Sequence, residues 1–390
     1  MHQTKETPVR QRSLLTTVLL GFVQFSAALL STLLMLLFLK GLFFSSGSTA
    51  PGGNVKVAGY DTMDRFDMYM TNAVSQALDG VLSIKKVYWL SDQDLVAPEP
   101  DQSAFGESED ASSLQWLLDD AAALLDGQQT LFSTDTPVWG KAPVRYYLDE
   151  TIFTVTWKQV IDNVVYTISE VKIADPSQFR RFLADGEYGS SRQYLTTEMA
   201  SSVNAVVASA GDFYKYRQGG IVVWEGKVRR FNQDRMETCG IDNKGNLVFM
   251  RRGQFESIEQ AQAFVDENNI RFTLSFGPIL IENYECCEPK SYVVGEINDE
   301  FSRSAICQMG DLHYLMVVAN AESRYSNYPT LHTFAKRIQE FGCEKAYTLD
   351  GGQTATIVMN DKLINRVSYG AQRQISDIVY FATAIPSKSK

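Results

Sequence analysis

The sequence has few of the residues that build structural metal sites and disulfide frameworks. Its 390 residues include 3 His and 5 Cys, and no two cysteines have the C-x-x-C spacing. This scarcity argues against a structural zinc site. An odd cysteine count with an adjacent pair, Cys286 and Cys287, is also unlike a disulfide framework. We expect most of the cysteines to be small buried apolar side chains.

Basic residues are in the minority as well. Lys and Arg number 36 against 46 Asp and Glu, which gives a formal net charge of -10. A general nucleic-acid binder needs a basic face that replaces the counterions of the phosphates. The charge balance therefore argues against a nucleic-acid partner. An anionic ligand would have to be met locally, by a few arginines.

One long stretch near the N-terminus lacks charge altogether. Residues 13–39 contain no charged side chain, and as a helix rising about 1.5 Å per residue they exceed a hydrocarbon core of about 30 Å. Lys5, Arg10 and Arg12 precede this run, and only Lys40 closes it. By the positive-inside rule, this asymmetry places the N-terminus in the cytoplasm.

We therefore expect four parts along the chain. Residues 1–12 form a cytoplasmic tail and residues 13–44 a transmembrane anchor in the lipid bilayer, so the protein crosses the cell membrane once and its C-terminal domain is extracytoplasmic. Residues 45–140 combine a Ser-, Gly- and Pro-containing linker with an acidic segment, a composition typical of an exposed stalk. Residues 141–390 form the domain. Cleavage of a signal peptide after Ala50 is the alternative to the anchor.

The domain reads as mostly β. From residue 144 onward, short runs of alternating and β-branched residues are separated by turn signals. Many neighbouring strands are joined by hairpin-like connections, and strands outnumber helices. We expect an α+β fold in which a large mixed β-sheet carries packed helices. Helices are expected at about residues 114–125, 175–183, 196–203, 257–268 and 330–340.

The clearest local signal for a functional site is centred on Asp350. An apolar run ends in this carboxylate, Gly351 and Gly352 follow, and a β-branched run starts at once. The order places Asp350 at the end of a strand beside a tight turn. The glycines allow a ligand to approach the backbone, and free N–H groups there can hold an anion. A hairpin corner in which Asp350 only caps the turn is the alternative.

Several other blocks fall into one pattern with this stretch. They are, in chain order, Thr196-Thr197-Glu198-Met199-Ala200, Asn204-Ala205-Val206-Val207, Gly211-Asp212-Phe213-Tyr214, Phe276-Gly277-Pro278-Ile279-Leu280, Arg303-Ser304-Ala305-Ile306 and Leu349-Asp350-Gly351-Gly352, followed by Asn365 and Arg373. Together they resemble the phosphodiester glycosidase family, whose members are N-acetylglucosamine-1-phosphodiester α-N-acetylglucosaminidase-like domains. The resemblance covers roughly residues 142 to 385. The chain departs from the family pattern at Ala210, where Asn is frequent, and at residues 353–355, where Gln-Thr-Ala stands for Gly-Ser-Ser.

The resemblance implies a hydrolase that removes a sugar from a phosphodiester-linked carbohydrate, such as a GlcNAc-1-phosphodiester in a surface or extracellular glycan. Glycosidases stabilise an oxocarbenium-like state with carboxylates, and Asp350 and Asp212 are the matching catalytic residues. Arg303 and Arg373 are the matching phosphate clamp, because a guanidinium group can hold two phosphate oxygens. Which carboxylate takes which role stays open.

Further substrate contacts are expected from a group of residues around these four. The group comprises Gly351, Gly352, Thr354, Gln353, Asn365, Arg217 and Ser368. No cofactor is expected, although two strand-end carboxylates can also bind a divalent cation through oxygen ligands. A non-catalytic module that binds an exopolysaccharide or cell-wall polymer through the same pocket is the alternative function, and a purely structural surface protein is a third.

Overall fold

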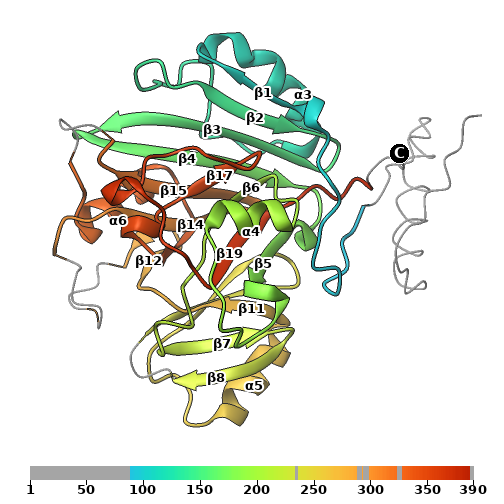
Figure 1. Cartoon of the computed structure of the whole chain (residues 1–390), viewed down its shortest axis with the longest axis vertical. Helices are drawn as coiled ribbons and strands as arrows, with labels where there is room; N and C mark the ends of the chain where they lie inside the picture. The colour runs from blue at the N-terminus through green and yellow to red at the C-terminus, as the bar shows by residue number, and fades with distance from the viewer. Residues whose placement is uncertain (1–87, 233–235, 288–291, 293–297, 323–326, 387–390) are drawn as a thin grey trace, which may run out of the picture. The chain divides into compact units, whose positions relative to one another are not determined.

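The computed structural model describes residues 88–232, 236–287, 292, 298–322 and 327–386 (Figure 1). These residues all belong to one compact unit, Val57–Lys390. The expected cytoplasmic tail, the anchor at residues 13–44 and the first part of the stalk lie outside them. Within the described ranges, no helix combines the length and the apolar character needed to cross a membrane.

The largest element is a nine-stranded sheet with the strand order β1-β2-β3-β4-β15-β14-β16-β12-β13. Its strands are β1 (Phe105–Ser108), β2 (Val144–Leu148), β3 (Ile152–Ile161), β4 (Val164–Ile173), β12 (Ile279–Glu282), β13 (Glu285–Cys286), β14 (Arg303–Gly310), β15 (His313–Asn320) and β16 (Lys345–Leu349). Strand β4 is buried along its whole length. The middle of this sheet is therefore covered on both faces.

A five-stranded sheet covers one of those faces. Its order is β18-β17-β6-β19-β5, with β5 (Phe179–Leu183), β6 (Val207–Ala210), β17 (Ile357–Met359), β18 (Lys362–Leu363) and β19 (Asp377–Phe381). The Phe179 ring centroid lies 4.7 Å from that of Phe381 in the same sheet and 5.0 Å from that of Tyr314 in the larger sheet. Buried aromatic and aliphatic side chains thus join the two sheets face to face.

Helices cover the two outer faces. The α-helices are α3 (Gln115–Leu125), α4 (Thr196–Ser202), α5 (Ile258–Glu267) and α6 (Leu331–Glu340). Leu117 of α3 and Phe334 of α6 belong to one buried cluster with Trp157 of the nine-stranded sheet. On the other side, Met199 of α4 packs in a cluster with Ile378 of the five-stranded sheet. The order of layers is helices, sheet, sheet, helix.

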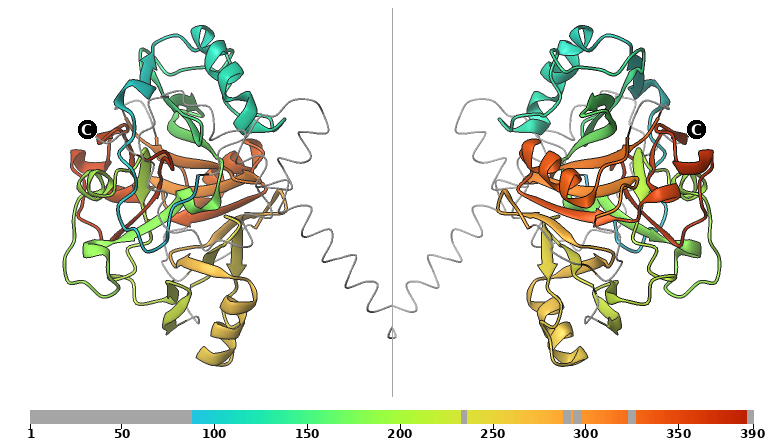
Figure 2. Two further views of the ribbon diagram at one scale, coloured as in Figure 1. Left: turned by 90° about the vertical axis from the view of Figure 1, so that its right-hand side faces the viewer. Right: turned by 90° about the vertical axis from the view of Figure 1, so that its left-hand side faces the viewer.

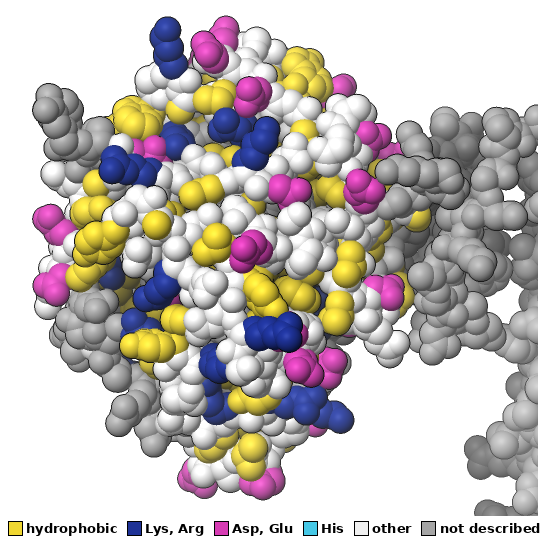
Figure 3. Space-filling model, viewed as in Figure 1, with side chains coloured by type: hydrophobic (Ala, Val, Ile, Leu, Met, Phe, Trp, Pro, Cys, Tyr) yellow, Lys and Arg dark blue, Asp and Glu magenta, His cyan; other side chains and the backbone are white. Residues whose placement is uncertain are grey.

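A smaller β-rich part continues from these layers. It contains the hairpin β7 (Gly220–Trp224) and β8 (Lys227–Asn232), the three strands β9 (Thr238–Asp242), β10 (Leu247–Met250) and β11 (Ile270–Leu274), and helix α5. Buried residues of β7 and α5 share a cluster of their own. Figure 2 shows this part at the opposite end of the described unit from α3. On the face drawn in Figure 3, lysines and arginines lie interspersed with aspartates and glutamates.

The sheets differ from the expected mixed sheet. Every strand pair in the described ranges is antiparallel. The reason is visible in the β3–β4 hairpin, where Asp162 and Asn163 have φ values of 51° and 62°. Such two-residue turns match the strand twist and can join only antiparallel neighbours. The described residues are mostly β, with four α-helices and several antiparallel sheets.

The expected helix at residues 175–183 is wrong. Only Pro176–Gln178 forms a turn of 3-10 helix, and strand β5 follows at once. The Asp175 side chain caps this turn by accepting a hydrogen bond from Ser177 N at 3.0 Å. Pairing of β5 with β19 then fixes the extended conformation, because tertiary contacts override local propensity.

Part of the expected stalk also belongs to the folded unit. Residues 105–108 form β1 and pair with β2 at the edge of the nine-stranded sheet. Residues 115–125 form α3, whose Leu117 and Ala121 are fully buried. The acidic and serine side chains that suggested a stalk instead cap short turns, as Asp110 does by accepting from Ser112 N at 2.9 Å.

The aromatic cluster between the sheets should carry much of the stability. We expect Phe179→Ala to lower the free energy of unfolding by about 3–5 kcal/mol, because it leaves a cavity where two sheets meet. Denaturant unfolding measures this loss. Ile258→Ala, at a side chain that is 42% exposed on α5, should change the same quantity by only about 0.5 kcal/mol. Equal effects of the two substitutions would contradict the packing described.

Candidate functional site

Asp350 lies where strands of the two sheets end side by side. Strand β16 of the larger sheet ends at Leu349, and β6 of the smaller sheet ends at Ala210. Asp350 N donates a hydrogen bond to Gly211 O at 3.1 Å. Strand β14, the neighbour of β16, begins at Arg303. Segments that are far apart in sequence therefore meet at one point.

Both positions after Asp350 need glycine, the first because of the space available and the second because of its backbone conformation. A Cβ atom on Gly351 would lie 2.4 Å from Ser302 O, which no side chain tolerates. Gly352 has a φ of 66° and opens a turn of 3-10 helix, η5 (Gly352–Thr354). Their N–H groups are not a free anion nest, because Gly351 N donates to Asp350 Oδ1 at 3.0 Å and Gly352 N donates to Ser302 O at 3.0 Å.

The Asp350 carboxylate is held by an arginine. Arg373 Nη2 donates to Asp350 Oδ2 at 2.7 Å, and the two side chains are 44% and 5% exposed. Burial raises the pKa of Asp350, while Arg373, Thr354 and Arg217 act in the opposite direction. The carboxylate thus stands at the edge of the protein interior, beside a guanidinium group that reaches solvent.

Aromatic rings hold the arginines near Asp350. The Arg373 guanidinium carbon lies 4.9 Å from the centroid of the Phe213 ring, and that of Arg217 lies 4.6 Å from the Phe276 ring. Both distances are typical of cation–π contacts. Two cationic groups are therefore fixed next to one carboxylate.

Arg303 enters the same region from β14. Ser304 pairs with Leu349 in the β14–β16 ladder, so Arg303 stands beside the start of the glycine turn. Its Nη2 donates to Asp299 O at 2.7 Å. Arg303 is largely buried, whereas Arg373 is the more accessible guanidinium.

Asp212 follows β6 directly, but its side chain turns into the interior. Its Oδ1 accepts from Arg181 Nη2 at 2.6 Å and from Tyr214 N at 2.8 Å, and its Oδ2 accepts from Ser275 N at 2.5 Å. The Asp212 side chain has no exposed surface. Burial raises the pKa of Asp212 to about 7, with the Arg181 charge opposing and the Asp377 carboxylate adding to the rise.

Arg181, Asp212 and Asp377 form a buried triad. Arg181 Nη2 and Nε donate to Asp377 Oδ2 at 2.9 Å and 3.1 Å. Asp377 in turn accepts from Asp212 N at 3.1 Å and from Phe213 N at 2.9 Å. A Cβ atom on Gly211 would lie 1.8 Å from Asp377 Oδ2, so only glycine fits there. The triad fixes the backbone segment whose Gly211 carbonyl accepts from Asp350.

The structure brings some predicted site residues together and separates others. Asp350, Arg373, Arg217 and the glycine turn gather, and Thr354 Oγ1 supports the turn by donating to Gly351 O at 2.7 Å. The remaining residues mainly hold the backbone.

Asn365 and Gln353 illustrate this second group. Asn365 Oδ1 accepts from Ile357 N at 2.7 Å, and its Nδ2 donates to Ala355 O at 2.8 Å, which fastens the start of β17. Gln353 Nε2 donates to Ala371 O at 3.2 Å. Asn365 is buried, and its amide already forms these backbone hydrogen bonds. The amide therefore has a structural role and does not face a substrate.

Sequence reasoning missed Arg181 and Asp377. Arg181 was hidden because residues 175–183 read as a helix. One sequence feature could have identified Asp377, namely that this carboxylate stands at the start of the apolar run that forms β19. Phe213 and Phe276, which hold the two arginines, lie inside motif blocks but were not assigned a role.

The alternative left open for Asp212 and Asp350, a divalent cation bound through oxygen ligands, finds no gathered ligand set in the described part of the chain. No group of three or more His, Cys, Asp or Glu side chains converges there. The two carboxylates considered as ligands, Asp212 and Asp350, each contact an arginine. They do not present a shared set of oxygen ligands.

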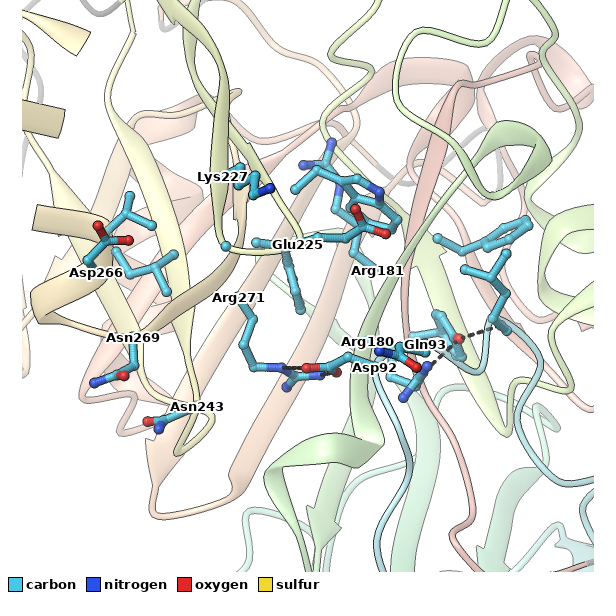
Figure 4. A pocket seen from close by; sticks show the side chains of 18 residues that line it. Asp92, Gln93, Arg180, Arg181, Glu225, Lys227, Asn243, Asp266, Asn269 and Arg271 are labelled. Atoms are coloured by element: carbon cyan, nitrogen blue, oxygen red, sulfur yellow. Dashed lines mark hydrogen bonds and ion pairs between the residues drawn. The ribbon is translucent and has the colours of Figure 1, made fainter. Parts of the chain in front are cut away.

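A separate cavity of about 760 Å³ is lined in part by one member of the triad. Arg181 is one of its lining residues, and Arg271 lies across it, paired with Asp92 at 2.5 Å (Figure 4). Arg271 Nη1 also donates to Pro176 O at 2.9 Å. Arg181 and Arg271 therefore bind neighbouring segments of the chain. Asp350 is not among the residues that line this cavity.

Comparison with protein families matches residues 203–382 to the phosphodiester glycosidase family. No curated protein matches the chain. A hypothetical protein from Synechocystis is 16% identical, with a TM-score of 0.49. The match covers 64% of the present chain and 64% of the length of that protein. The catalytic domain of zebrafish N-acetylglucosamine-1-phosphodiester alpha-N-acetylglucosaminidase, auto-inhibited by its pro-peptide, is 18% identical with a TM-score of 0.48, over 67% of this chain and 92% of that one.

The triad should be as important for stability as its burial implies. We expect Arg181→Met to lower the free energy of unfolding by about 3–5 kcal/mol, because two carboxylates then stay buried without their cation. Arg192→Met removes a pair with Asp185 in which the arginine is 72% exposed, and should cost at most about 1 kcal/mol. Thermal and denaturant unfolding compare the two. A small effect of Arg181→Met would show that the triad is not a buried ionic network.

Proposed function

Because residues 203–382 carry a domain of the phosphodiester glycosidase family, we propose that this protein is a hydrolase that splits a sugar-1-phosphodiester, such as a GlcNAc-1-phosphodiester, in a surface or extracellular glycan. The observation that carries the proposal is the 2.7 Å contact between Asp350 and Arg373. It joins a carboxylate suited to an anomeric centre with a guanidinium suited to phosphate.

In this proposal, ionised Asp350 acts on the sugar. The bond between the anomeric carbon and the phosphate oxygen breaks, and its electron pair leaves with the phosphate monoester. Asp350 stabilises the positive charge that develops on the sugar ring, and water then adds to the anomeric carbon and gives its proton to the released phosphate monoester or to bulk water. A phosphate monoester is a weakly basic leaving group, so charge-assisted hydrogen bonds to its oxygens can replace a strong general acid.

Arg373 and Arg217 bind the leaving phosphate. Arg373 is 44% exposed, so it can donate to a ligand oxygen and still neutralise Asp350. Arg217 is held over Phe276, and its charge acts on Asp350 in the same direction as that of Arg373. Arg303 supplies a third positive charge from β14, while the glycine turn gives the sugar room to approach.

Asp212 is a positioning residue in this proposal and not the second catalytic carboxylate. Its side chain has no exposed surface and lies against Arg181. Through Asp377, the same triad holds Gly211 and Phe213. Asp212 therefore supports the mechanism by fixing the backbone beside Asp350.

The proposed setting is the outer side of the cell membrane. The uncharged run at residues 13–39 and the cations before it support a membrane anchor at residues 13–44 with the domain outside. An extracytoplasmic position suits a substrate that belongs to a surface or extracellular glycan.

Asp350→Asn tests the reaction directly. We expect the full-length protein to release free GlcNAc from a methyl GlcNAc-1-phosphate diester, and the variant to be slower by about 10²–10⁴-fold. Asp361→Asn, at an exposed turn between β17 and β18, should leave the rate unchanged. Binding of the diester by wild type and Asp350→Asn without any release of sugar would instead support a non-catalytic module for a polymer.

The charge of Arg373 should set the pH dependence. Asp350 acts as a carboxylate, so activity falls as the pH drops through its pKa. Arg373→Gln removes a charge that lowers this pKa, and the acidic limb of kcat/KM should move to higher pH. The control Arg192→Gln lies on the surface and should leave the limb in place. If the acidic limb of kcat/KM stays at the same pH in Arg373→Gln, Asp350 is not the group whose protonation causes the loss of activity.

A further inference from the structure

Two tyrosines near Asp350 keep their rings in solvent. Tyr216 is 73% exposed and Tyr369 is 91% exposed. Aromatic side chains usually bury large areas and stabilise cores or interfaces. Rings left this open make little contribution to the packing of the domain.

Tyr216 is connected to Asp350 through an ordered series of contacts. Its ring is stacked on the ring of Phe213, with centroids 5.3 Å apart and an interplanar angle of 9°. The guanidinium of Arg373 lies 4.9 Å from the same Phe213 ring and binds Asp350. Phe213 has a φ of 54°, and its N–H is held by the Asp377 carboxylate. The Tyr216 ring and the Arg373 guanidinium therefore contact one and the same aromatic ring, which holds the tyrosine within one residue of the arginine that would bind phosphate.

Tyr369 is fixed on the side of the glycine turn. It lies in a turn of 3-10 helix, η6 (Ser368–Gly370), and Ser368 Oγ is 2.7 Å from Ser302 Oγ. The carbonyl of Ser302 accepts from Gly352 N at 3.0 Å. Tyr369 thus follows a residue that is hydrogen-bonded to the segment that anchors the turn.

The backbone of Tyr369 is also strained. Its φ is 59°, a left-handed conformation that costs a bulky residue about 1–2 kcal/mol. No burial of the ring offsets this cost, since the side chain is almost fully exposed. Strain that packing does not explain is frequent at sites that bind ligands.

We infer that Tyr216 and Tyr369 are specificity-determining residues, whose rings bind sugar rings of a glycan that extends beyond the sugar released. This inference rests on the proposed function. The flat apolar face of a tyrosine complements the C–H face of a pyranose, while its hydroxyl stays in water. Tyr216 is linked to Asp350 through Phe213 and Arg373, and Tyr369 follows Ser368, which is hydrogen-bonded to the segment that anchors the glycine turn. Neither ring carries charge, so both suit the neutral parts of a phosphodiester-linked glycan.

The chain offers a closely matched control. Tyr284 is 57% exposed and has a φ of 66°. It sits in the two-residue turn between β12 and β13, where the hairpin itself requires the left-handed conformation. Tyr284 N donates to Glu344 O, beside the start of β16, whereas Asp350 follows the other end of that strand. Tyr284→Ala thus removes a largely exposed ring with a left-handed backbone at the far end of β16 from Asp350.

The test compares two substrates with full-length protein. One is the methyl GlcNAc-1-phosphate diester, and the other is a GlcNAc-1-phosphate diester whose second ester group is an oligosaccharide, which stays on the departing phosphate. We expect Tyr216→Ala or Tyr369→Ala to raise KM for the oligosaccharide diester by about 2- to 12-fold, with kcat and the methyl diester unaffected. Tyr216→Phe and Tyr369→Phe keep the ring and should behave as wild type. Tyr284→Ala should change neither substrate.

A calorimetric arm separates this inference from the proposed reaction. Asp350→Asn, alone and combined with Tyr216→Ala or Tyr369→Ala, is titrated with the oligosaccharide diester. Weaker binding in the combined variants supports the tyrosines even if wild type releases no sugar, in which case the proposed hydrolysis fails alone. Equal KM and equal binding with and without the two rings would overturn the inference, as would an equal loss on both substrates.

Discussion

The interaction on which the site depends is the contact of Arg181 with two buried carboxylates. A guanidinium group cannot be deprotonated in a protein, so its burial demands compensating negative charge. Asp212 and Asp377 supply it, and all three side chains have no exposed surface. Arg181 also donates to Thr273 O of β11, and Asp212 accepts from Ser275 N. The triad therefore ties the five-stranded sheet to the smaller β-rich part.

The triad reaches Asp350 through the backbone and not through a side chain. Asp377 receives two N–H groups from residues 212 and 213, and this holds the left-handed turn at Phe213. The carbonyl just before that turn accepts from Asp350 N. A carboxylate that never meets solvent thus determines where a more accessible carboxylate stands. The two strand-end aspartates thus have different environments, one fully enclosed beside Arg181 and the other beside the partly exposed Arg373.

Local patterns were enough to predict Asp350 and its turn. An apolar strand, a carboxylate and two glycines follow each other within a few residues, so their geometry depends on neighbours in sequence. Asp212 was also correctly placed just after a strand, but the direction of its side chain depends on Arg181. The hydrogen bond between Arg181 and Asp377 spans 196 positions, and no spacing rule reveals such a pair. The helix expected over residues 175–183 failed for the same reason, since β5 exists through its pairing with β19.

The attachment of residues 101–125 to the large sheet changes where the smallest autonomous unit begins. Strand β1 occupies the outer edge of β2, and α3 covers the apolar face around Trp157. In a polypeptide starting at residue 141, the backbone groups on one edge of β2 would be unpaired and this apolar face would be exposed to solvent. A large apolar face left exposed in this way favours self-association. Residues 101–125 therefore belong to the domain as much as the strands they cover, and a truncation at residue 141 would remove part of its hydrophobic core.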